Sequence, residues 1–474
     1  ITFSGYENEQ VTLDGRGINK EDILVESDYI TIKKITAINS KRSGIQVGSQ
    51  DDINRIHTQG TIITNCTVFQ NGDGIKVFSG VQNFLIDYVV AYNNSVGISI
   101  GSPTPFPSAS GLGEPAYWTG SVQYNPLDPI NPRLIGRSGS VVYDINTLPP
   151  INLIPAPPST FFPTNWTVSN SISYDNTQCS EGSDGISAPY TYHVTIKNNI
   201  VFGNTDDGID SLGSIENIIE NNYIFANGDV RSFVQGGGQC SPGGGGDGNG
   251  IKVGTRGGGG NVIRNNVVFG NMRAGFDNDD GQGDVYYSNT IYGNEQRGVW
   301  IEDDVLGYVQ GSIFVNNLAA NNSNGDFWLG IPYTSNYNLW ASGVFPQNEG
   351  INSIIGNPLF LNPPDISFNL NDSSANGVDH SYIVLDSNGD GLIDILDISG
   401  IRNQVKQFFE LQFNSPKSPA INAGTNLQDY FTSLRNQAPQ SSQYWYLYDH
   451  ALNTLPSPYQ YNGSAPDIAG KNIA

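Results

Sequence analysis

Cysteine, methionine and charged side chains are scarce in this sequence. Its 474 residues include three Cys and one Met, and Asp, Glu, Lys and Arg together make up 14% of the chain. A helical bundle or a coiled coil would be rich in Ala, Glu, Lys and Leu, so this composition disfavours both. No apolar run approaches the roughly 18 residues of a membrane-spanning helix, and we therefore expect no membrane span.

The three cysteines form no CxxC pair and show no zinc-binding spacing. Cys66 lies in an apolar run and is expected to be a buried thiol. Cys179 and Cys240 both lie in loop-like segments and could pair, which would suit a secreted, extracellular protein. The sequence leaves this pairing open.

Positive charge is also scarce, with 22 Lys and Arg against 45 Asp and Glu, which gives a formal net charge of −23. This balance argues against nonspecific nucleic-acid binding, which needs a basic face. An acidic protein can still bind a polyanion, but it then needs bridging cations or a local basic patch. Aromatic residues at 11%, together with short β-branched runs, argue against disorder.

What the sequence does contain is an internal repeat. Each copy is an apolar run ending in an aromatic residue, then any residue, Asn, a variable gap and Gly-apolar-X. The aromatic residue recurs at intervals of 23, as from 202 to 225 and from 269 to 292. The copies, given by their aromatic, Asn and Gly, are Phe69/Asn71/Gly74, Tyr92/Asn94/Gly97, Tyr174/Asn176/Gly185, Phe202/Asn204/Gly208, Phe225/Asn227/Gly250, Phe269/Asn271/Gly275 and Tyr292/Asn294/Gly298.

This repeat predicts an all-β fold. A period near 23 residues, built from short β-branched strands and Asn/Gly turns, is typical of a parallel β-helix with about three strands per coil. The Asn position predicts a ladder of hydrogen-bonded side chains, and the aromatic position predicts a stacked row in the core. The Leu/Asn consensus of a leucine-rich repeat is absent, and the density of Val, Ile, Asn and Gly excludes helical repeats.

The repeat also sets the expected domain organisation. It predicts a β-helix domain at 1–335 and a C-terminal capping region at 336–474, where the repeat degrades. Two gaps between Asn and Gly are long, namely 176–185 and 227–250, and the second contains a loop at 229–248. Both insertions leave the same turn on neighbouring coils, where loops on a rigid scaffold commonly build the binding site. A Pro-rich insertion at about 102–165 is expected to form a lobe beside the coils.

Four carboxylates gather on about two adjacent coils, those of Asp184, Asp206, Asp207 and Asp210. Asp184 is expected directly under Asp207. Without a counter-charge these groups would repel one another strongly. Converging carboxylate oxygens suit Ca²⁺, a hard cation that takes six to eight oxygen ligands. The alternative interpretation is a set of solvated turn aspartates, which are common in Asn/Asp-rich solenoids.

Residues at equivalent repeat positions stack in a column, which places Lys252 between Asp210 and Asp277, about one strand spacing from each. One interpretation of Lys252 is a counter-ion for these two carboxylates. The other is a general base, because nearby Ca²⁺ disfavours the ammonium and lowers its pKa toward neutrality. Lys76 occupies the same column away from the aspartate cluster and is expected to be structural.

Further residues along or beside this face could contact a ligand. Arg256, Arg273 and Arg297 could bind carboxylates, since Arg presents a bidentate fork. Exposed arginines are, however, more often plain surface charges. Asn249 and Trp300 are also expected to contact a substrate.

The segment from 184 to 280 resembles the family 9 polysaccharide lyases, which include pectate lyases. The resemblance rests on Asp184, the run Asp206-Asp207-Gly-Ile-Asp210 and the run GNGIKVG at 248–254, and it extends over about 1–330. It implies a right-handed β-helix, one catalytic Ca²⁺ held by the four aspartates, and Lys252 as the base that removes the C5 proton of a uronate before β-elimination. The chain departs from the family at Ile251 and Val253, where Phe and Leu are usual, and in its Pro-rich insertion and C-terminal region.

A second calcium motif lies in the C-terminal region. The run 386–397 fits a twelve-residue calcium loop with a glycine at position 6. Its expected ligands are Asp386, Asn388, Asp390, Asp394 and Asp397. Asp at position 12 is typical of dockerin repeats, but these normally have two such loops. The run DNDDGQGD at 277–284 is more typical of a solvated turn than of another ion site.

Other functions have weaker support. The run NTDDGIDS resembles the Asn-Thr-Asp motif of family 28 polygalacturonases, but their Gly-His-Gly and Arg-Ile-Lys motifs are missing. The Asp-Pro-His motif of mannuronan epimerases is absent, and a non-catalytic adhesin or tailspike would use the solenoid as a rigid rod. We expect a secreted, monomeric, calcium-dependent lyase that acts on a uronate-containing acidic polysaccharide, with no nucleic-acid partner.

Overall fold

The fold was analysed in a computed structural model. It describes residues 1–6, 9–17, 20–49, 58–78, 80–101, 123–124, 134–135, 164–177, 182–228, 233–234, 238–239, 246–254, 259–279, 283–302, 312–329, 334–342, 349–368, 380–412, 414–440 and 443–456. Most of the Pro-rich insertion, most of the 229–248 loop, and Cys179, Cys240 and Arg256 lie outside these residues.

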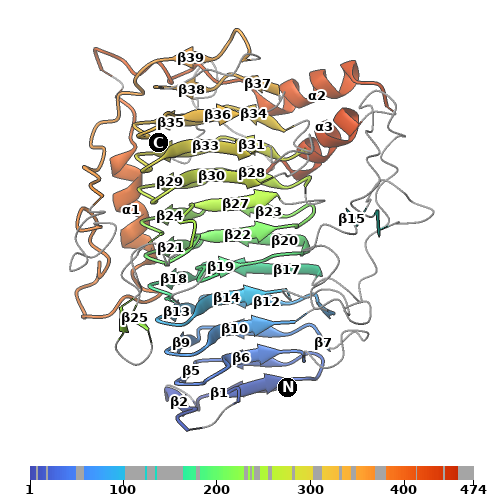
Figure 1. Ribbon diagram of the computed structural model, residues 1–474, viewed down its shortest axis with the longest axis vertical. Coiled ribbons are helices and arrows are strands. Elements are labelled where there is room, and N and C mark those ends of the chain that lie inside the picture. Colours follow the sequence, from blue (N-terminus) through green and yellow to red (C-terminus); the bar gives the residue numbers. More distant parts are fainter. Residues whose placement is uncertain are drawn as a thin grey trace.

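Three parallel sheets, here called A, B and C, run the length of the molecule, and the chain passes through them in that order on each coil (Figure 1). The predicted parallel β-helix is therefore confirmed. One coil consists of β20 (Tyr192–Lys197) in sheet A, β21 (Ile200–Phe202) in sheet B and β22 (Ile209–Leu212) in sheet C. Each strand pairs in parallel with the equivalent strands of the coils before and after it.

The remaining strands follow the same order. Sheet A contains, in addition to β20, β1 (Thr2–Ser4), β4 (Thr31–Lys33), β8 (Ile62–Thr64), β12 (Leu85–Asp87), β17 (Thr164–Ser169), β23 (Ile218–Glu220), β28 (Val262–Arg264), β31 (Val285–Tyr287), β34 (Ile313–Val315), β37 (Thr334–Asn336) and, at its margin, β7 (Thr58–Gln59) and β11 (Val81–Gln82). Sheet B contains, in addition to β21, β2 (Val11–Asp14), β5 (Ile35–Ile38), β9 (Thr67–Phe69), β13 (Val90–Tyr92), β18 (Ile172–Tyr174), β24 (Tyr223–Phe225), β29 (Val267–Phe269), β32 (Thr290–Tyr292), β35 (Leu318–Ala320), β38 (Leu339–Trp340) and β39 (Ile354–Ile355). Sheet C contains, in addition to β22, β3 (Ile23–Val25), β6 (Ser43–Val47), β10 (Asp73–Val77), β14 (Val96–Ile100), β19 (Ile186–Ser187), β27 (Ile251–Gly254), β30 (Ala274–Asp279), β33 (Arg297–Glu302) and β36 (Phe327–Leu329). Two short antiparallel pairs lie outside the coils, β15 (Gln123–Tyr124) with β16 (Leu134–Ile135) and β25 (Phe233–Val234) with β26 (Gly238–Gln239).

The sharp turns between sheets explain why asparagine is so frequent. The turn from sheet A to sheet B begins with one residue in the left-handed region, such as Asn198 at φ 57° or Asn221 at φ 56°. Asparagine tolerates this region better than most residues because its short polar side chain can form local hydrogen bonds. The next residue, Asn199 or Asn222, is fully buried inside the coil.

The predicted asparagine ladder at the turn from sheet B to sheet C is confirmed. Asn204 Oδ1, for example, accepts hydrogen bonds from the backbone and side-chain nitrogens of Asn176 at 3.2 and 2.8 Å. The ladder continues through Asn71, Asn94, Asn176, Asn204, Asn227, Asn271, Asn294 and Asn322. A second ladder, which we did not predict, occupies the turn from sheet A to sheet B and comprises Asn199, Asn222, Asn266, Asn289, Asn317 and Asn338.

The predicted aromatic row is confirmed as a stack in a hydrophobic core. Successive rings lie 4.7 to 5.1 Å apart from Phe69 to Phe269. Alternate residues of a strand point to opposite faces, and the middle residues of the sheet B strands, such as Val201 and Val268, fill the interior of the coil. The aromatic rings therefore lie on the outer face of sheet B, where they belong to a second core outside the coil.

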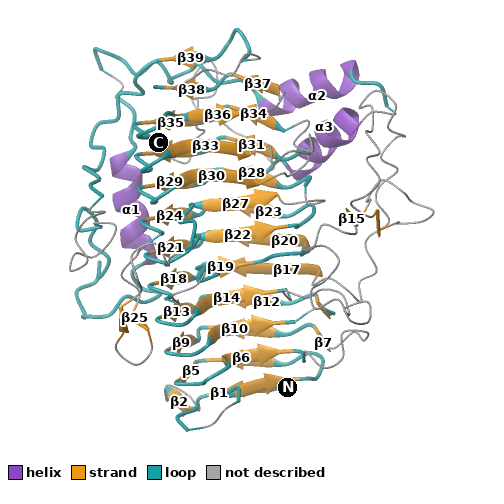
Figure 2. Ribbon diagram, viewed as in Figure 1, coloured by secondary structure: helices purple, strands orange, loops and turns teal. Residues whose placement is uncertain are grey.

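The C-terminal region buries this outer face. Helix α1 (Ile398–Phe408) lies along sheet B, and Phe409 packs edge-on against Phe269 at 5.3 Å. Helices α2 (Leu427–Gln437) and α3 (Gln443–Thr454) pack in the same way on the outer face of sheet A (Figure 2). Neither apolar cluster includes a sheet C residue in the part of the chain that the structure describes. Sheet C is thus the face that these helices leave open.

The two ends of the run 277–284 differ from the solvated turn expected from the sequence, and residues 280–282 lie outside the described residues. Asp277 and Asp284 are both buried. Asp284 Oδ1 accepts hydrogen bonds from the backbone and side-chain nitrogens of Asn261, so it occupies a ladder position that asparagine fills on other coils. Burial raises the pKa of Asp284 to about 7, although the hydrogen bonds from Asn261 and Asn278 lower it.

We predict that Asp284→Asn stabilises the protein increasingly as pH rises from about 4 to 7. The folded-state pKa lies above the unfolded value of 3.8, so the wild type loses stability as pH rises through this interval, whereas asparagine does not titrate. At about 1.4 kcal/mol per pKa unit, the gain in the free energy of unfolding should reach roughly 2 to 4 kcal/mol near neutral pH. Urea denaturation across this pH range measures it, with the exposed Asp365→Asn as control. A pH-independent difference between wild type and Asp284→Asn would contradict the argument.

Candidate active site

Three carboxylates converge at the turn that leads into sheet C. Asp184 precedes β19, and Asp206 and Asp207 precede β22 on the next coil. Their side chains are only 2, 7 and 2% exposed, and one ligand oxygen of each lies within 4.8 Å of the others. Asp210, the fourth expected ligand, lies in β22 and is not part of this close group.

Two of these carboxylates extend a side-chain ladder of the kind that asparagine forms elsewhere. Asp184 Oδ1 accepts a hydrogen bond from the Asp207 backbone nitrogen at 3.2 Å, and Asp207 Oδ1 accepts one from the Asn249 nitrogen at 2.7 Å. Asn249 Oδ1 in turn accepts one from the Ala274 nitrogen at 3.1 Å. The ladder uses one oxygen of each carboxylate and leaves the second oxygen outside it.

Asp206 joins the ends of the two insertions. Its Oδ2 accepts a hydrogen bond from the Gly182 nitrogen at 2.6 Å, and its Oδ1 accepts one from the Asp247 nitrogen at 2.6 Å. Gly182 belongs to the 176–185 insertion and Asp247 ends the 229–248 loop. The two insertions therefore meet at one carboxylate, as their common origin on neighbouring coils predicted.

The electrostatics of this group fit a cation. Burial raises the pKa of Asp184 and Asp207 well above the ordinary value, and repulsion from neighbouring carboxylates adds to the effect. Burial also raises the pKa of Asp206, and it raises that of Asp210 to about 7. Positive charge at this point would offset both the burial of the charged carboxylates and their mutual repulsion. Three carboxylates also form the all-oxygen donor set that a hard divalent cation prefers. The residues present therefore fit a metal ion.

The predicted column along sheet C is confirmed strand by strand. Asp210 pairs with Lys252, and Lys252 pairs with Asp277. The column runs on to Trp300 and Trp328 in β33 and β36. Lys76 occupies the same column on an earlier coil and donates a hydrogen bond to Ser99 Oγ at 2.6 Å.

Lys252 lies among carboxylates. Its Nζ contacts Asp247 Oδ2 at 2.5 Å. Burial lowers the pKa of Lys252, but Asp207, Asp247 and Asp210 raise it more, so the net shift is upward. In this arrangement Lys252 carries a proton, and it can act as a base only if positive charge is added nearby.

The other predicted contacts fall into different environments. Arg273 Nη1 pairs with Asp247 Oδ1 at 2.5 Å, and its guanidinium lies 4.5 Å from the Trp300 ring centroid. Arg297 lies 4.7 Å from Trp300. Asn249 is fully buried, and its side chain donates to Asp277 Oδ2 at 3.1 Å, so it braces the site from within.

Two residues of this face were missed by the sequence reasoning. Asp247 contacts both Lys252 and Arg273, and the signal was an acidic residue at the end of the long loop, five positions before the lysine. Trp328 lies 4.3 Å from Arg297 and edge-on to Trp300 at 6.0 Å. Its copy of the repeat lacks the glycine-apolar signature, since Asp326-Phe327 stands there instead.

The C-terminal run 386–397 forms a tight loop around its own carboxylates. Asp386 accepts hydrogen bonds from the nitrogens of Gly389 and Gly391, and Asp397 accepts them from Ser387 and Asn388 as well as Asp394. The glycines have φ of 78° and 87°. Asn388, Asp390 and Asp394 each accept a hydrogen bond from the backbone nitrogen two residues later in the chain. Among the described residues, only Asp184, Asp206 and Asp207 bring three carboxylate oxygens within 4.8 Å of one another. The carboxylates of the 386–397 loop lie farther apart.

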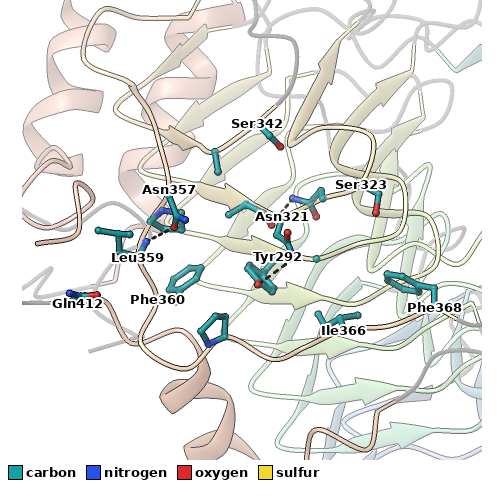
Figure 3. Close-up of a pocket in the computed structure, with 16 residues that line it drawn as sticks. Tyr292, Asn321, Ser323, Ser342, Asn357, Leu359, Phe360, Ile366, Phe368 and Gln412 are labelled. Carbon is teal, nitrogen blue, oxygen red and sulfur yellow. Dashed lines mark hydrogen bonds between the residues drawn. The ribbon is translucent and has the colours of Figure 1, made fainter. Parts of the chain in front are cut away.

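A cavity of about 630 Å³ lies elsewhere, between the late coils and the segment 357–368. Tyr292, Asn321 and Phe360 line it, and Asn321 donates a hydrogen bond to the Tyr292 hydroxyl at 3.4 Å (Figure 3). Among the described residues, no charged side chain lines it. It shares no residue with the carboxylate group or Lys252.

Comparisons with known proteins agree with the fold. The family model described as "right handed beta helix region" matches residues 161–383, which gives the handedness of the coils. No curated protein matches the chain. Among solved structures, pectate lyase Pel9A is 17% identical with a TM-score of 0.46, covering 93% of this chain and 86% of its own. The alginate lyase from Paenibacillus sp. str. FPU-7 is 14% identical with a TM-score of 0.38, covering 70% and 90%. The A-module of the mannuronan C-5 epimerase AlgE6 from Azotobacter vinelandii is 14% identical with a TM-score of 0.37, covering 62% and 58%.

Two smaller expectations can also be compared with the structure. Cys66 is a buried free thiol, and burial raises its pKa to about 11. None of the helices described here is both long and apolar enough to cross a membrane.

Proposed function

We propose that this protein is a secreted, calcium-dependent polysaccharide lyase that cleaves a uronate-containing acidic polysaccharide by β-elimination. The observation that carries the proposal is the placement of Lys252 in sheet C, paired with Asp210 and Asp277 and in electrostatic contact with the buried carboxylate group. The buried acidic cluster and the lysine both lie at the sheet that the described C-terminal helices leave uncovered. Together they provide a metal-binding set beside a base.

The chain's own residues would divide the work as follows. Asp184, Asp206 and Asp207, with Asp210 nearby, would hold Ca²⁺. Bound there, the ion supplies positive charge that acidifies the C5 proton next to a uronate carboxylate and offsets the carboxylates that keep Lys252 protonated.

Neutral Lys252 would then take the C5 proton. The electron pair of the C5–H bond becomes the C4–C5 double bond, and the C4–O bond breaks, so that the leaving sugar carries away the bonding pair as its oxygen is protonated. Arg273 would position the substrate carboxylate, since its bidentate fork stands beside Lys252 through their shared partner Asp247.

The proposal predicts that Lys252→Ala lowers the rate of elimination by at least about 100-fold, the usual contribution of a general base. The assay is the ultraviolet absorbance of unsaturated uronate on polygalacturonate, alginate and other acidic polysaccharides, with Ca²⁺ and then with chelator. Lys76→Ala is the matched control, because Lys76 lies in the same column and follows Gly-Asp-Gly-Ile, where Lys252 follows Gly-Asn-Gly-Ile. It should retain activity.

Each other result of this assay has a definite meaning. Reducing ends without unsaturation would mean hydrolysis and transfer the catalytic role to the carboxylates. Unchanged elimination in Lys252→Ala, or in chelator, would refute the proposed base or the proposed metal. Inactivity of the wild type on every polymer would favour a non-catalytic solenoid.

We further predict that Asp207→Asn stabilises the protein in chelator and weakens its stabilisation by Ca²⁺. Asparagine keeps the ladder acceptor for Asn249 but removes a buried charge, so in chelator the variant should unfold at a higher temperature than the wild type. In Ca²⁺ it should gain less stability than the wild type, because one ligand charge is gone. Thermal unfolding in both buffers measures this. Asp73→Asn is the control, because Asp73 precedes the glycine of its repeat as Asp207 does. The same calcium response in Asp207→Asn and wild type would exclude Asp207 as a ligand.

The loop 386–397 is proposed to hold a second, structural Ca²⁺ next to α1. Asp390→Ala should remove one equivalent of bound Ca²⁺ in calorimetric titration and lower the calcium-dependent thermal stability, because Asp390 is an exposed ligand position with no role in packing. Asp429→Ala, on the surface of α2, serves as control. An unchanged stoichiometry in Asp390→Ala would mean that the loop is held by its own hydrogen bonds.

A further inference from the structure

The aromatic column on the outer face of sheet B stops before the coils end. From Phe69 to Tyr292 each coil places a ring in this column, whereas the residue in register with Tyr292 on the next coil is Ala320. The pairing of β35 with β38 places Ala341 after Ala320. Tyr292, Ala320 and Ala341 all line the cavity of about 630 Å³. The cavity therefore lies where two rings of the column are missing.

The C-terminal region encloses this space on its outer side. Phe360 forms an antiparallel bridge with Leu411, and its ring packs edge-on against Tyr292 at 5.8 Å. Ile366 closes one end, since a Cβ added to Gly293 would meet Ile366 Cδ1 at 2.7 Å. Backbone pairing thus holds one wall in place opposite sheet B. The volume lies within the roughly 300 to 1,000 Å³ that is usual for small-molecule sites.

Polar groups face each other across the cavity. Asn321, at φ 60°, donates a hydrogen bond to the Tyr292 hydroxyl at 3.4 Å. The hydroxyl proton and Asn321 Oδ1 can bond a further partner. On the other side, Asn357 Oδ1 accepts a hydrogen bond from the Leu359 nitrogen at 2.8 Å, so the amide nitrogen of Asn357 is the group that can donate to a ligand (Figure 3). Donors and acceptors therefore flank the aromatic walls.

The charges around the cavity disfavour an acidic ligand. Among the described residues no charged side chain lines it, so a ligand carboxylate would have no basic partner there. The nearby charges are negative, because two lining serines donate hydrogen bonds to carboxylates. Ser323 Oγ bonds Glu295 at 3.5 Å, and Ser342 Oγ bonds Asp326 at 3.2 Å. A uronate would be repelled here, in contrast to the cation-dependent site on sheet C.

A neutral sugar ring fits all three features. A pyranose has an apolar C–H face that packs on aromatic rings, hydroxyl groups at its edge that bond amides and hydroxyls, and no charge. Its thickness is comparable to that of the ring that each earlier coil contributes. Pockets that combine apolar walls with a few placed polar groups are typical ligand sites.

We propose that this cavity binds one neutral pyranose unit in the gap of the aromatic column. The sugar lies against Tyr292 and Phe360, and its hydroxyls bond Asn321 and Asn357. The cavity lies on sheet B and shares no residue with Lys252 or the carboxylate group, so the site would exist whether or not the protein is a lyase. It gives the protein a specificity for a neutral sugar that is separate from the proposed acidic substrate.

The first test compares each neutral sugar with its own uronate. The full-length wild type is titrated by calorimetry, in chelator, with methyl galactoside, methyl glucoside and methyl mannoside and with the three corresponding methyl uronides. At least one neutral glycoside should bind, and its uronide should bind at least about 10-fold more weakly, a difference of about 1.4 kcal/mol. Equal or tighter binding of the uronide overturns the proposal, and so does a lack of binding by all three neutral glycosides.

The second test fills the cavity. Ala320→Phe returns a ring to the column next to Tyr292, so it should weaken binding of the neutral glycoside by at least about 10-fold. A melting temperature no lower than that of the wild type would show that the fold is kept. Unchanged binding in a folded Ala320→Phe variant would mean that the sugar binds elsewhere, and would overturn the proposal.

A third variant removes one polar contact without filling the space. Asn321→Gly should weaken binding about 3- to 10-fold, the contribution of one hydrogen bond. Glycine suits this turn, where Gly203 and Gly293 have φ of 66° and 59°. Asn93→Gly is the matched control, because Asn93 follows the column residue of an earlier coil at φ 52° and does not line the cavity. Unchanged binding in Asn321→Gly, or an equal loss in Asn93→Gly, would contradict the proposed site.

Discussion

Coil-to-coil register, held by buried side-chain amides, is the constraint on which the rest of this structure depends. At the turns that form the two ladders, one residue lies in the left-handed region and the next is a buried asparagine whose amide bonds the next coil. A buried amide without a partner is costly, so a slip of one residue would break every step of two ladders. The same register aligns the sheet C side chains into a column, and the proposed site follows from that alignment.

The carboxylate group is a local modification of this ladder. At the position before glycine, Asp184 and Asp207 make the backbone contacts that asparagine makes at other turns, and each brings a second oxygen and a charge. The coil remains geometrically regular while its stability becomes dependent on a counter-charge. Asp284 shows the same replacement at another turn without neighbouring carboxylates, where Asn261 and Asn278 bond it. Clustering therefore makes the difference between a tolerated buried acid and a group that could hold a metal ion.

Sequence reasoning was most successful where one repeat determines one structural position. Spacing alone predicts one coil for each repeat, the first asparagine ladder, and the pairing of Lys252 with Asp210 and Asp277. It said less where the answer depends on which segment covers a face. The aromatic row was predicted as core and is buried, but no spacing indicates that α1 and Phe409 bury it on the outer face of sheet B. Asp247 was missed because it ends a loop of irregular length, and no repeat position predicts its contact with Lys252.

The placement of the C-terminal region leaves sheet C to carry the charged side chains of the candidate site. Helices α1, α2 and α3 cover the aromatic and aliphatic outer faces of sheets B and A, so these sheets need no charge for solubility. Sheet C, left open, concentrates Lys252, Arg273 and Arg297 beside a group of buried carboxylates that favours a cation. Without a bound cation these carboxylates outweigh the basic side chains and hold Lys252 protonated. The proposed binding of an acidic polymer at this sheet therefore depends on a cation among the carboxylates, because the ion would offset the local negative charge in a protein that repels polyanions elsewhere.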